Sequence, residues 1–345
     1  MTNLKRRSAR ALACASAFVA VLSAASARAD DKDSDKETGT LSILFENDIF
    51  YHTDRDYTNG VQIAWTTPPD QNWDWATETA RWLPYFGQEG EVRTSYSIGQ
   101  NIYTPSNLHL ADPDPSDRPY AGFLYLGLGI INETPDLGDG SVRQLDQAEL
   151  DLGVVGPDSL AQNSQDFVHR IINDTIPQGW DYQLRNEPAL VLKDEKTWKF
   201  SSWKVLGFSF DVDPHVGAAV GNVYDFVNAG AMARFGFNLP DDYGPVRIDP
   251  SLPGSNFFKP TGAIGAYLFA GVDGRAIARN IFLDGNTWQD SRHVTKIPYV
   301  GDLQLGAALT FRAFRLTFTH VFRTKEFTTQ AHSDQFGAIN LSVRF

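Results

Sequence analysis

The sequence predicts an all-β fold, an antiparallel transmembrane β-barrel of about twelve strands with a short helix in one extracellular loop. Three observations support this prediction. The chain begins with a basic and then apolar export signal. Several later segments alternate large apolar residues with small or polar ones, as strands between lipid and a barrel lumen do. Residues 340–345 alternate in the same way and end on Phe345, a pattern typical of the last strand of a bacterial outer-membrane barrel.

Residues 1–29 have the features of a secretory signal peptide. A basic start is followed by an apolar run over residues 11–25, which is too short to span a bilayer comfortably. Ala27-Arg28-Ala29 is a small-x-small cleavage site, so we expect cleavage before Asp30. The one cysteine, Cys14, lies inside this segment. The mature chain therefore has neither disulfides nor thiol chemistry.

The mature chain is strongly acidic and forms one domain. Loss of residues 1–29 removes five of the 30 basic residues and none of the 42 acidic ones, so the formal charge changes from -12 to -17. We therefore expect no nucleic-acid partner. Residues 30–39 are polar and charged, and we expect a flexible leader there. Residues 40–345 contain no internal repeat or linker and are assigned to one outer-membrane β-barrel.

The strands are assigned from alternation. In the segment 298–311, for example, Leu303 and Leu305 alternate with Gln304 and Gly306. A soluble sandwich would turn its large residues inward, whereas here the small and polar set suits a lumen. The alternation is least regular in the sixth to eighth strands, and residues 282–288 are an alternative extension of the ninth. The predicted strands are 40–50, 57–67, 93–103, 121–132, 146–156, 182–193, 201–213, 225–237, 263–273, 298–311, 313–323 and 334–345.

Strand parity assigns each connection to one side of the membrane. With both termini in the periplasm, the connections 51–56, 104–120 and 157–181 lie outside the cell. The connection 68–92 is then periplasmic. Its three tryptophans, Trp73, Trp75 and Trp82, suggest either a short interfacial helix or, as we prefer, anchoring in an aromatic belt at the membrane interface.

The connection 157–181 contains helical spacing over residues 160–174. Asp158 or Ser159 would cap this helix, and Pro177 and Gly179 would end it. Its apolar stripe must rest on the barrel wall or on lipid. The stripe consists of Phe167, Val168, Ile171 and Ile172. Gln165 lies one turn before His169 on the same face.

The candidate chemistry lies in the first hairpin and in this helix. Asn47 and Asp48 end the first strand and Thr58 begins the second, which together suit an oxygen-rich cation or catalytic site. His169 is the candidate general base. Neither Gly-x-Ser-x-Gly nor His-Glu-x-x-His is present, so a water activated by His169 with a cation at Asp48 fits best.

Each of these residues also has a simpler interpretation. Asn47 and Asp48 could be a polar strand end, Thr58 a turn hydroxyl and His169 a surface histidine. Alternation places Asn47 and Asp48 on opposite faces unless a bulge or twist intervenes. Arg118 could bind a phosphate, or the segment 117–122 could be a structured turn before a strand.

Several sequence blocks, in fixed order, resemble the outer-membrane lipid A 3′-O-deacylases of the LpxR family. The resemblance spans almost the whole mature chain. The blocks are Glu46-Asn47-Asp48, Asp56-Tyr57-Thr58-Asn59-Gly60, Gly99-Gln100-Asn101-Ile102-Tyr103-Thr104-Pro105-Ser106, Asp117-Arg118-Pro119-Tyr120-Ala121, Gly153-Val154-Val155-Gly156-Pro157-Asp158, His169-Arg170-Ile171-Ile172 and Gly179-Trp180.

The resemblance implies a twelve-stranded barrel that removes the 3′ acyloxyacyl chain of lipid A with the help of Ca²⁺. It implies a site between the barrel wall and a loop helix, with catalytic roles for Asn47, Asp48, Thr58 and His169. A lysine of the family has no counterpart in Asn107-Leu108-His109-Leu110. Either another basic residue, with Arg118 as the candidate, contacts the lipid phosphate, or the substrate differs. Gln165 is a further candidate substrate contact.

The resemblance leaves two other functions to be tested. A calcium-dependent outer-membrane phospholipase would use the same chemistry on another lipid, and a non-enzymatic channel or scaffold would use none of it. About twelve strands make a lumen that side chains largely fill, which argues against a channel. We expect lipid A and outer-membrane lipids as partners, and a monomer.

Overall fold

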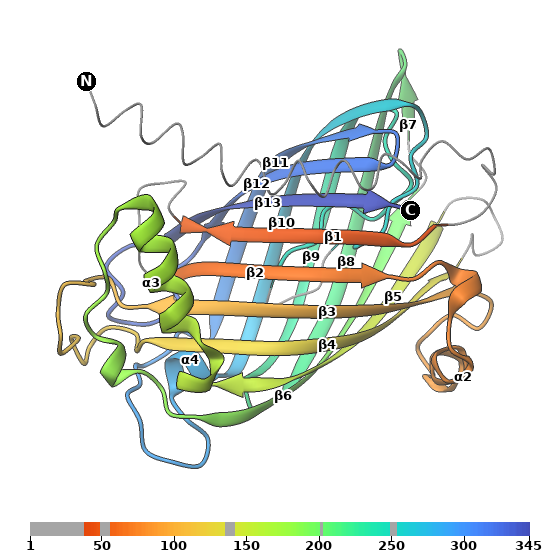
Figure 1. The fold of residues 1–345 in the computed structure, drawn as a ribbon. Coiled ribbons are helices and arrows are strands. Elements are labelled where there is room, and N and C mark those ends of the chain that lie inside the picture. Colours follow the sequence, from red (N-terminus) through yellow and green to blue (C-terminus); the bar gives the residue numbers. More distant parts are fainter. Residues whose placement is uncertain (1–37, 49–55, 135–141, 201–202, 249–253) are drawn as a thin grey trace, which may run out of the picture.

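The computed structural model describes residues 38–48, 56–134, 142–200, 203–248 and 254–345 (Figure 1). Over these residues the chain forms one antiparallel sheet in which strands that follow one another in sequence pair, except that β6 pairs with β8 and not with β7. The pairings of β1 with β13 and of β6 with β8 close this sheet into a barrel of twelve strands. The predicted fold is therefore confirmed. The predicted signal peptide 1–29, most of the leader 30–39 and the hairpin tip 51–55 lie outside the described residues.

The strands of the barrel are 8 to 17 residues long. β7 is a three-residue extension that pairs only with β8. The strands are β1 Thr40–Asn47, β2 Asp56–Thr66, β3 Glu91–Thr104, β4 Ala121–Thr134, β5 Val142–Val155, β6 Glu187–Phe200, β7 Trp203–Val205, β8 Phe208–Gly221, β9 Tyr224–Phe237, β10 Ile264–Asn280, β11 Tyr299–Phe311, β12 Phe314–Arg323 and β13 Asp334–Arg344.

Two predicted strands are displaced along the chain. The sixth was expected at 182–193 and the seventh at 201–213, whereas β6 and β8 begin five and seven residues later. The charged run 193–196 continues β6, because its alternate side chains have partners on both faces of the wall. Lys193 lies within 2.7 Å of both Glu149 and Asp151. The ninth predicted strand corresponds to β10. β10 ends at Asn280, so residues 282–288 do not extend it.

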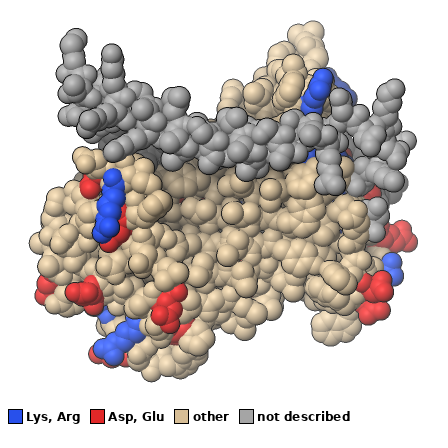
Figure 2. Space-filling view, viewed as in Figure 1, with Lys and Arg blue, Asp and Glu red and all other residues tan. Residues whose placement is uncertain are grey.

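One face of the wall is apolar and faces outward. Alternate residues of β10, such as Leu268 and Val272, are exposed, while residues of the other alternate set, such as Asp273 and Arg275, are buried in the lumen. Figure 2 shows the same pattern on one side of the barrel, where charged side chains gather near the two ends and the middle of the wall has none. This is the surface that a membrane-spanning barrel presents to lipid.

The connection between β9 and β10 folds back into the lumen. The backbone amide of Ile248 donates to Glu46 Oε1 at 3.1 Å, and Ser42 Oγ donates to the carbonyl of Asn256 at 3.1 Å. Ile248 also packs on Leu44 and Ala338 from the inner face of β1 and β13. We call the described part of this connection, residues 238–248 and 254–263, the plug segment. It occupies the lumen near the end of the barrel at which β1 begins and β13 ends. We call this end the proximal end.

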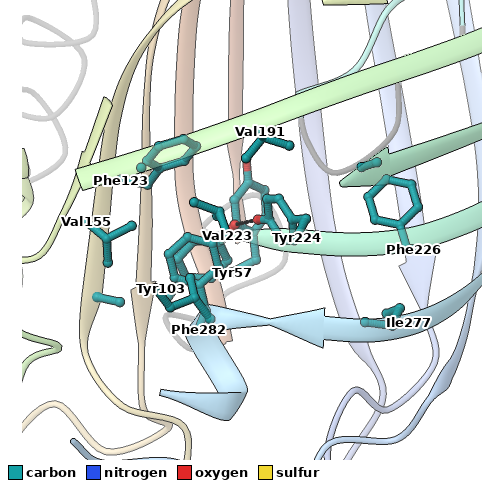
Figure 3. Close-up of a cluster of buried hydrophobic side chains, with 14 of the residues drawn as sticks. Tyr57, Tyr103, Phe123, Val155, Val191, Val223, Tyr224, Phe226, Ile277 and Phe282 are labelled. Carbon is teal, nitrogen blue, oxygen red and sulfur yellow. Dashed lines mark hydrogen bonds between the residues drawn. The ribbon is translucent and has the colours of Figure 1, made fainter. Parts of the chain in front are cut away.

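The lumen towards the opposite, distal end is filled by aromatic side chains. Tyr103 stacks on Phe282 with ring centroids 4.0 Å apart, and its hydroxyl lies 2.6 Å from that of Tyr224 (Figure 3). Phe282 comes from α4, Ile281–Asp284, which follows the distal end of β10 and turns into the barrel. The described residues therefore close the lumen from both ends.

Two further helices pack on the outside of the wall, over β3 and β4. α2, Asp74–Trp82, lies at the proximal end and α3, Ala161–Ile172, at the distal end (Figure 1). The single-turn helices are η2 Pro69–Gln71, η3 Pro157–Ser159 and η4 Trp180–Tyr182. Among the described residues, every helix is too short or too polar to cross a membrane.

Candidate functional site

A pocket of about 400 Å³ lies between α3 and the outer wall formed by β1, β2, β3 and β4. Its polar side chains gather near the distal strand ends, and its apolar ones continue along the wall. The polar set is Asn47, Thr58, Asn59, Gln100, Ser164, Gln165 and His169; the apolar set is Phe45, Val61, Ile63, Ile98, Ile102, Leu124, Phe167 and Val168. The pocket therefore brings together four residues predicted from sequence, Asn47, Thr58, Gln165 and His169.

Asn47 and Asp48 behave as strand alternation predicts. Glu46 faces the lumen, where it accepts from Ile248, so Asn47 faces outward and lines the pocket beside Phe45. Asp48 is buried but does not line the pocket. The structure thus places one member of this pair in the site and the other behind it.

A β-bulge turns Thr58 towards the pocket. In the pairing of β2 with β3, Tyr57 opposes Tyr103 and Asn59 opposes Ile102, so Thr58 is an extra residue. Tyr57 packs inside the lumen, whereas Thr58 and Asn59 both line the outer pocket. A regular strand would have turned one of these two neighbours inward. Thr58 Oγ1 lies 2.7 Å from Thr104 Oγ1, which fixes the hydroxyl at the pocket floor.

Close contact with the wall seats the first turn of α3. A Cβ atom at Gly122 would lie 2.1 Å from Ser159 Oγ and 2.2 Å from Ala161 Cβ, so only glycine leaves room for this approach. Gln100 Nε2 donates to the carbonyl of Ser159 at 2.6 Å. Leu160 precedes the helix in the left-handed region, and Ala161 N lies 3.4 Å from Ser159 Oγ. Gly122 and Gln100 were not recognised as site residues from sequence.

The face of α3 that is buried against the wall is polar, and the sequence leaves open whether this face or the apolar stripe meets the barrel. Ala161, Gln165 and His169 face the wall. Phe167 and Val168 of the predicted apolar stripe are 65% and 40% exposed. These two side chains border the pocket and continue the apolar outer wall, which agrees with the alternative in which the stripe meets lipid.

His169 is oriented by the chain that follows the helix. Its Nδ1 contacts the carbonyl oxygen of Thr175. A carbonyl oxygen only accepts hydrogen bonds, so Nδ1 carries the proton and Nε2 of the neutral ring is the basic nitrogen. The side chain is 5% exposed and lines the pocket. His169 is therefore a pocket residue whose ring orientation is fixed by a hydrogen bond, and not a histidine on a helix surface.

Gln165 is held in a similar way. Its Oε1 accepts a hydrogen bond from Trp180 Nε1 at 2.9 Å. Indole nitrogen only donates, so this contact fixes which end of the amide is oxygen. The Nε2 of Gln165 is buried and has no hydrogen-bond partner among the described atoms. An unused donor in the wall of a pocket is suited to a carbonyl or oxyanion.

The structure places Arg118 away from this pocket. Its side chain is fully buried, its Nη1 lies 3.2 Å from Glu326 Oε2, and its guanidinium lies over the ring of Tyr103. This inner position corrects the expectation that Arg118 contacts a lipid phosphate, because the partner of the guanidinium is a carboxylate of the barrel.

The donors in the pocket are oxygen atoms of the kind that Ca²⁺ prefers. The Asn47 amide and the Thr58 hydroxyl line it, with the Asp48 carboxylate adjacent in sequence. Among the residues that the structure describes, no three His, Cys, Asp or Glu side chains form a cluster able to hold a metal. The amide and hydroxyl oxygens therefore fit a hard cation in kind, whereas the Asp48 carboxylate lies outside the pocket lining.

Comparisons with known proteins agree with this architecture. The sequence matches the family described as "Outer membrane protein LpxR" over residues 12–345. LpxR from Salmonella typhimurium has a similar structure, with a TM-score of 0.71 and 22% sequence identity, over 89% of this chain and 100% of that chain. The β domain of the Bordetella autotransporter BrkA gives a TM-score of 0.44 at 8% identity, over 90% and 99% of the two chains. No curated protein sequence matches.

The match to the family extends over nearly the whole sequence, and the Salmonella structure has the same barrel fold. The resemblance inferred from the sequence blocks is therefore confirmed, as is the location in the bacterial outer membrane. The chain belongs to the LpxR family of outer-membrane proteins.

Proposed function

We propose that this protein is a lipid A deacylase that hydrolyses the 3′-linked acyloxyacyl ester of lipid A. The observation that supports this most is the pocket itself, which combines an oriented histidine and an unused amide donor with an apolar wall that faces lipid. Such a pocket accepts an ester at its polar end while the attached acyl chain stays in a membrane-like environment.

The reaction begins with a water molecule beside His169. Nε2 of His169 takes a proton from this water as its oxygen attacks the ester carbonyl carbon. The bond between that carbon and the sugar 3′ oxygen then breaks, and the imidazolium returns the proton to the sugar oxygen. The products are a free acyloxy fatty acid and a 3′ hydroxyl. The contact of Nδ1 with the Thr175 carbonyl stabilises the imidazolium in between.

The negative charge that develops on the carbonyl oxygen needs donors or a cation. Gln165 Nε2 supplies one donor from the helix side of the pocket. Asn47 and Thr58 would hold Ca²⁺ on the wall side through their oxygen atoms, and the Asp48 carboxylate, which does not line the pocket, would join them only after turning towards it at the strand end. When bound there, Ca²⁺ would polarise the ester carbonyl and stabilise negative charge on its oxygen.

The apolar part of the pocket suits a substrate that arrives sideways from the membrane. Ile63 and Ile98 are 44% and 48% exposed on the outer wall, and Phe167 of α3 faces them across the pocket. An acyl chain lying between these side chains stays in hydrocarbon, so its transfer from the bilayer involves little change of environment.

The test uses the purified full-length barrel in vesicles that contain hexa-acylated lipid A, with mass spectrometry of the lipid. We expect loss of one acyloxyacyl group, and His169→Ala should slow this loss by about 100-fold or more. His293→Ala is the matched control, because His293 is exposed on a distal connection outside the pocket. Removal of Ca²⁺ with a chelator should reduce the rate of both His293→Ala and wild type.

Vesicles of phospholipid without lipid A distinguish the alternative hydrolase. Release of lyso-phospholipid that depends on His169, with lipid A unchanged, would mean a phospholipase instead. Unchanged lipids in both preparations, from a barrel that remains folded by heat-modifiable electrophoresis, would overturn the proposal of a hydrolase.

A further inference from the structure

α2 packs on the outside of the barrel rather than under its opening. Its inner face consists of Ala76 and Ala80, which are buried against Val92 and Ile130. Both wall residues belong to the outward-facing set of β3 and β4, because their exposed neighbours in the same set include Tyr96 and Leu128. The helix therefore covers a patch of the lipid-facing wall near the proximal end.

The part of α2 that turns away from this patch carries large aromatic side chains. Trp75 and Trp82, seven residues apart, lie on one flank and are 42% and 80% exposed. Trp73 precedes the helix, and its Nε1 donates to the hydroxyl of Tyr96 on the wall at 2.8 Å. This contact makes the aromatic flank continuous with the surface that faces lipid.

The segment after α2 covers polar groups that would otherwise face the membrane. Asp146 Oδ2 accepts from the backbone amide of Gly87 at 2.9 Å, and Lys196 Nζ lies 3.0 Å from Asp146 Oδ1. Tyr85 is exposed beside them. The aromatic side chains thus border the level at which the wall changes from apolar to polar, where tryptophan and tyrosine concentrate in membrane proteins.

We infer that α2 is an interfacial anchor whose aromatic flank lies in the periplasmic leaflet of the outer membrane. The occupant of this flank is the phospholipid monolayer, because the flank extends a surface that lipid already covers. Asp74 and Arg81, also seven residues apart, lie one step around the helix from the two tryptophans. These two charged residues face water or headgroups, as expected of a helix lying in an interface.

The anchor has a consequence for the pocket at the other end. α2 and α3 contact the same two strands, β3 and β4, at opposite ends of the span. A helix fixed in the periplasmic leaflet therefore fixes the depth at which the α3 pocket meets the outer leaflet. This consequence rests on the proposed function, whereas the anchoring itself does not.

Site-directed spin labels test the anchoring directly. The one native cysteine, Cys14, is replaced by serine, and single labels are introduced by Trp75→Cys, Trp82→Cys, Asp74→Cys and Arg81→Cys. The full-length barrel is reconstituted in vesicles of phosphatidylethanolamine and phosphatidylglycerol, and collisions with oxygen and with a water-soluble nickel chelate are compared. We expect the oxygen-to-nickel ratio to be higher at 75 and 82 than at 74 and 81.

Equal, water-like ratios at all four positions would overturn the inference. Labels at 75 and 82 shielded from both reagents would do so too, because the flank would then be covered by protein, such as a second copy. If a cysteine variant fails to fold, the experiment uses tryptophan fluorescence instead. The emission of the native chain and of Trp82→Phe is measured in vesicles of brominated phospholipid. The native chain should then lose a larger fraction of its tryptophan emission than Trp82→Phe does. None of these readouts depends on deacylation, so failure of the proposed function would leave them intact.

Discussion

At the scale of single residues, the orientation of the Gln165 amide depends on Trp180. The indole nitrogen holds Gln165 Oε1 at 2.9 Å and so directs Nε2 to the pocket. Trp180→Phe keeps the aromatic packing on Tyr120 but removes the donor. A hydrogen bond of about 1 kcal/mol corresponds to about a fivefold change in rate, so we expect kcat/KM for lipid A to fall about fivefold. Steady-state deacylation assays measure this.

The double variant Gln165→Ala with Trp180→Phe provides the control for this prediction. If Trp180 acts through Gln165, the second substitution should add little to the first, and the cycle should show a coupling. Additive losses would mean that Trp180 contributes only through packing.

Sequence reasoning identified four of the seven polar pocket residues but not how they converge. Asn47, Thr58, Gln165 and His169 were all expected to be functional, and all line one pocket. The bulge that turns Thr58 outward could not be predicted from the pattern. Thr58 and Asn59 are both polar, so the sequence does not show which of the two faces outward. Arg118 was a candidate phosphate contact because the family's lysine is missing, with a structured turn as the alternative, and only the fold shows its carboxylate partner Glu326.

At the scale of elements, the position of α3 depends on the absence of a side chain at Gly122. Gly122→Ala would place a methyl group 2.1 Å from Ser159 Oγ and 2.2 Å from Ala161 Cβ, so the first turn must move off the wall. A shift of about 1 Å in catalytic geometry can cost about 100-fold in rate. We therefore expect a loss of this order in deacylation while the barrel still shows its heat-modifiable mobility.

Gly301→Ala is the matched control for this change. Gly301 lies on β11, and an added Cβ would meet nothing nearer than Thr324 Cγ2 at 3.8 Å. Partial recovery in the double variant Gly122→Ala with Ala161→Gly would support the contact as the cause. Activity of Gly122→Ala equal to that of wild type would contradict it.

The elements themselves were predictable where one face of the wall was apolar. Most strands lie within a few residues of their predicted bounds, and the helix expected at 160–174 spans Ala161–Ile172. β6 was misplaced because outward-facing Lys196 breaks the apolar pattern. The segment after α2 covers Lys196, and this tertiary contact cannot be read from the local sequence. The sequence leaves open whether the apolar stripe of α3 meets the wall or lipid, because only the fold shows which face of the helix is buried against the barrel.

At the scale of the whole molecule, the barrel is a filled scaffold. The plug segment occupies the proximal lumen, and the aromatic cluster of Figure 3 occupies the distal lumen. Between them, Asp302 lies within 3.1 Å of three buried arginines, Arg247, Arg275 and Arg323. These contacts argue against the channel hypothesis and give the α3 pocket a rigid wall.

One attachment of the plug segment to the wall is a pair of buried ion pairs made by Asp242. One carboxylate oxygen of Asp242 binds Arg234 of β9 and the other binds Arg315 of β12, and all three side chains are fully buried. Arg234 also has Asp211 at 2.6 Å, but Arg315 has no second carboxylate partner among the described residues. Asp242→Ala would leave buried positive charge without compensation, which costs about 3–5 kcal/mol.

We therefore expect Asp242→Ala to lower the temperature at which the folded band converts to the unfolded band in electrophoresis. Asp290→Ala is the control, since Asp290 is exposed on a distal connection and should leave this temperature unchanged. Because Asp242 is remote from the α3 pocket, residual folded protein should keep its deacylation rate per molecule. A variant with wild-type thermal stability would mean that the plug segment is held by its other contacts. The ion pairs of Asp242 would then be dispensable for closing the barrel.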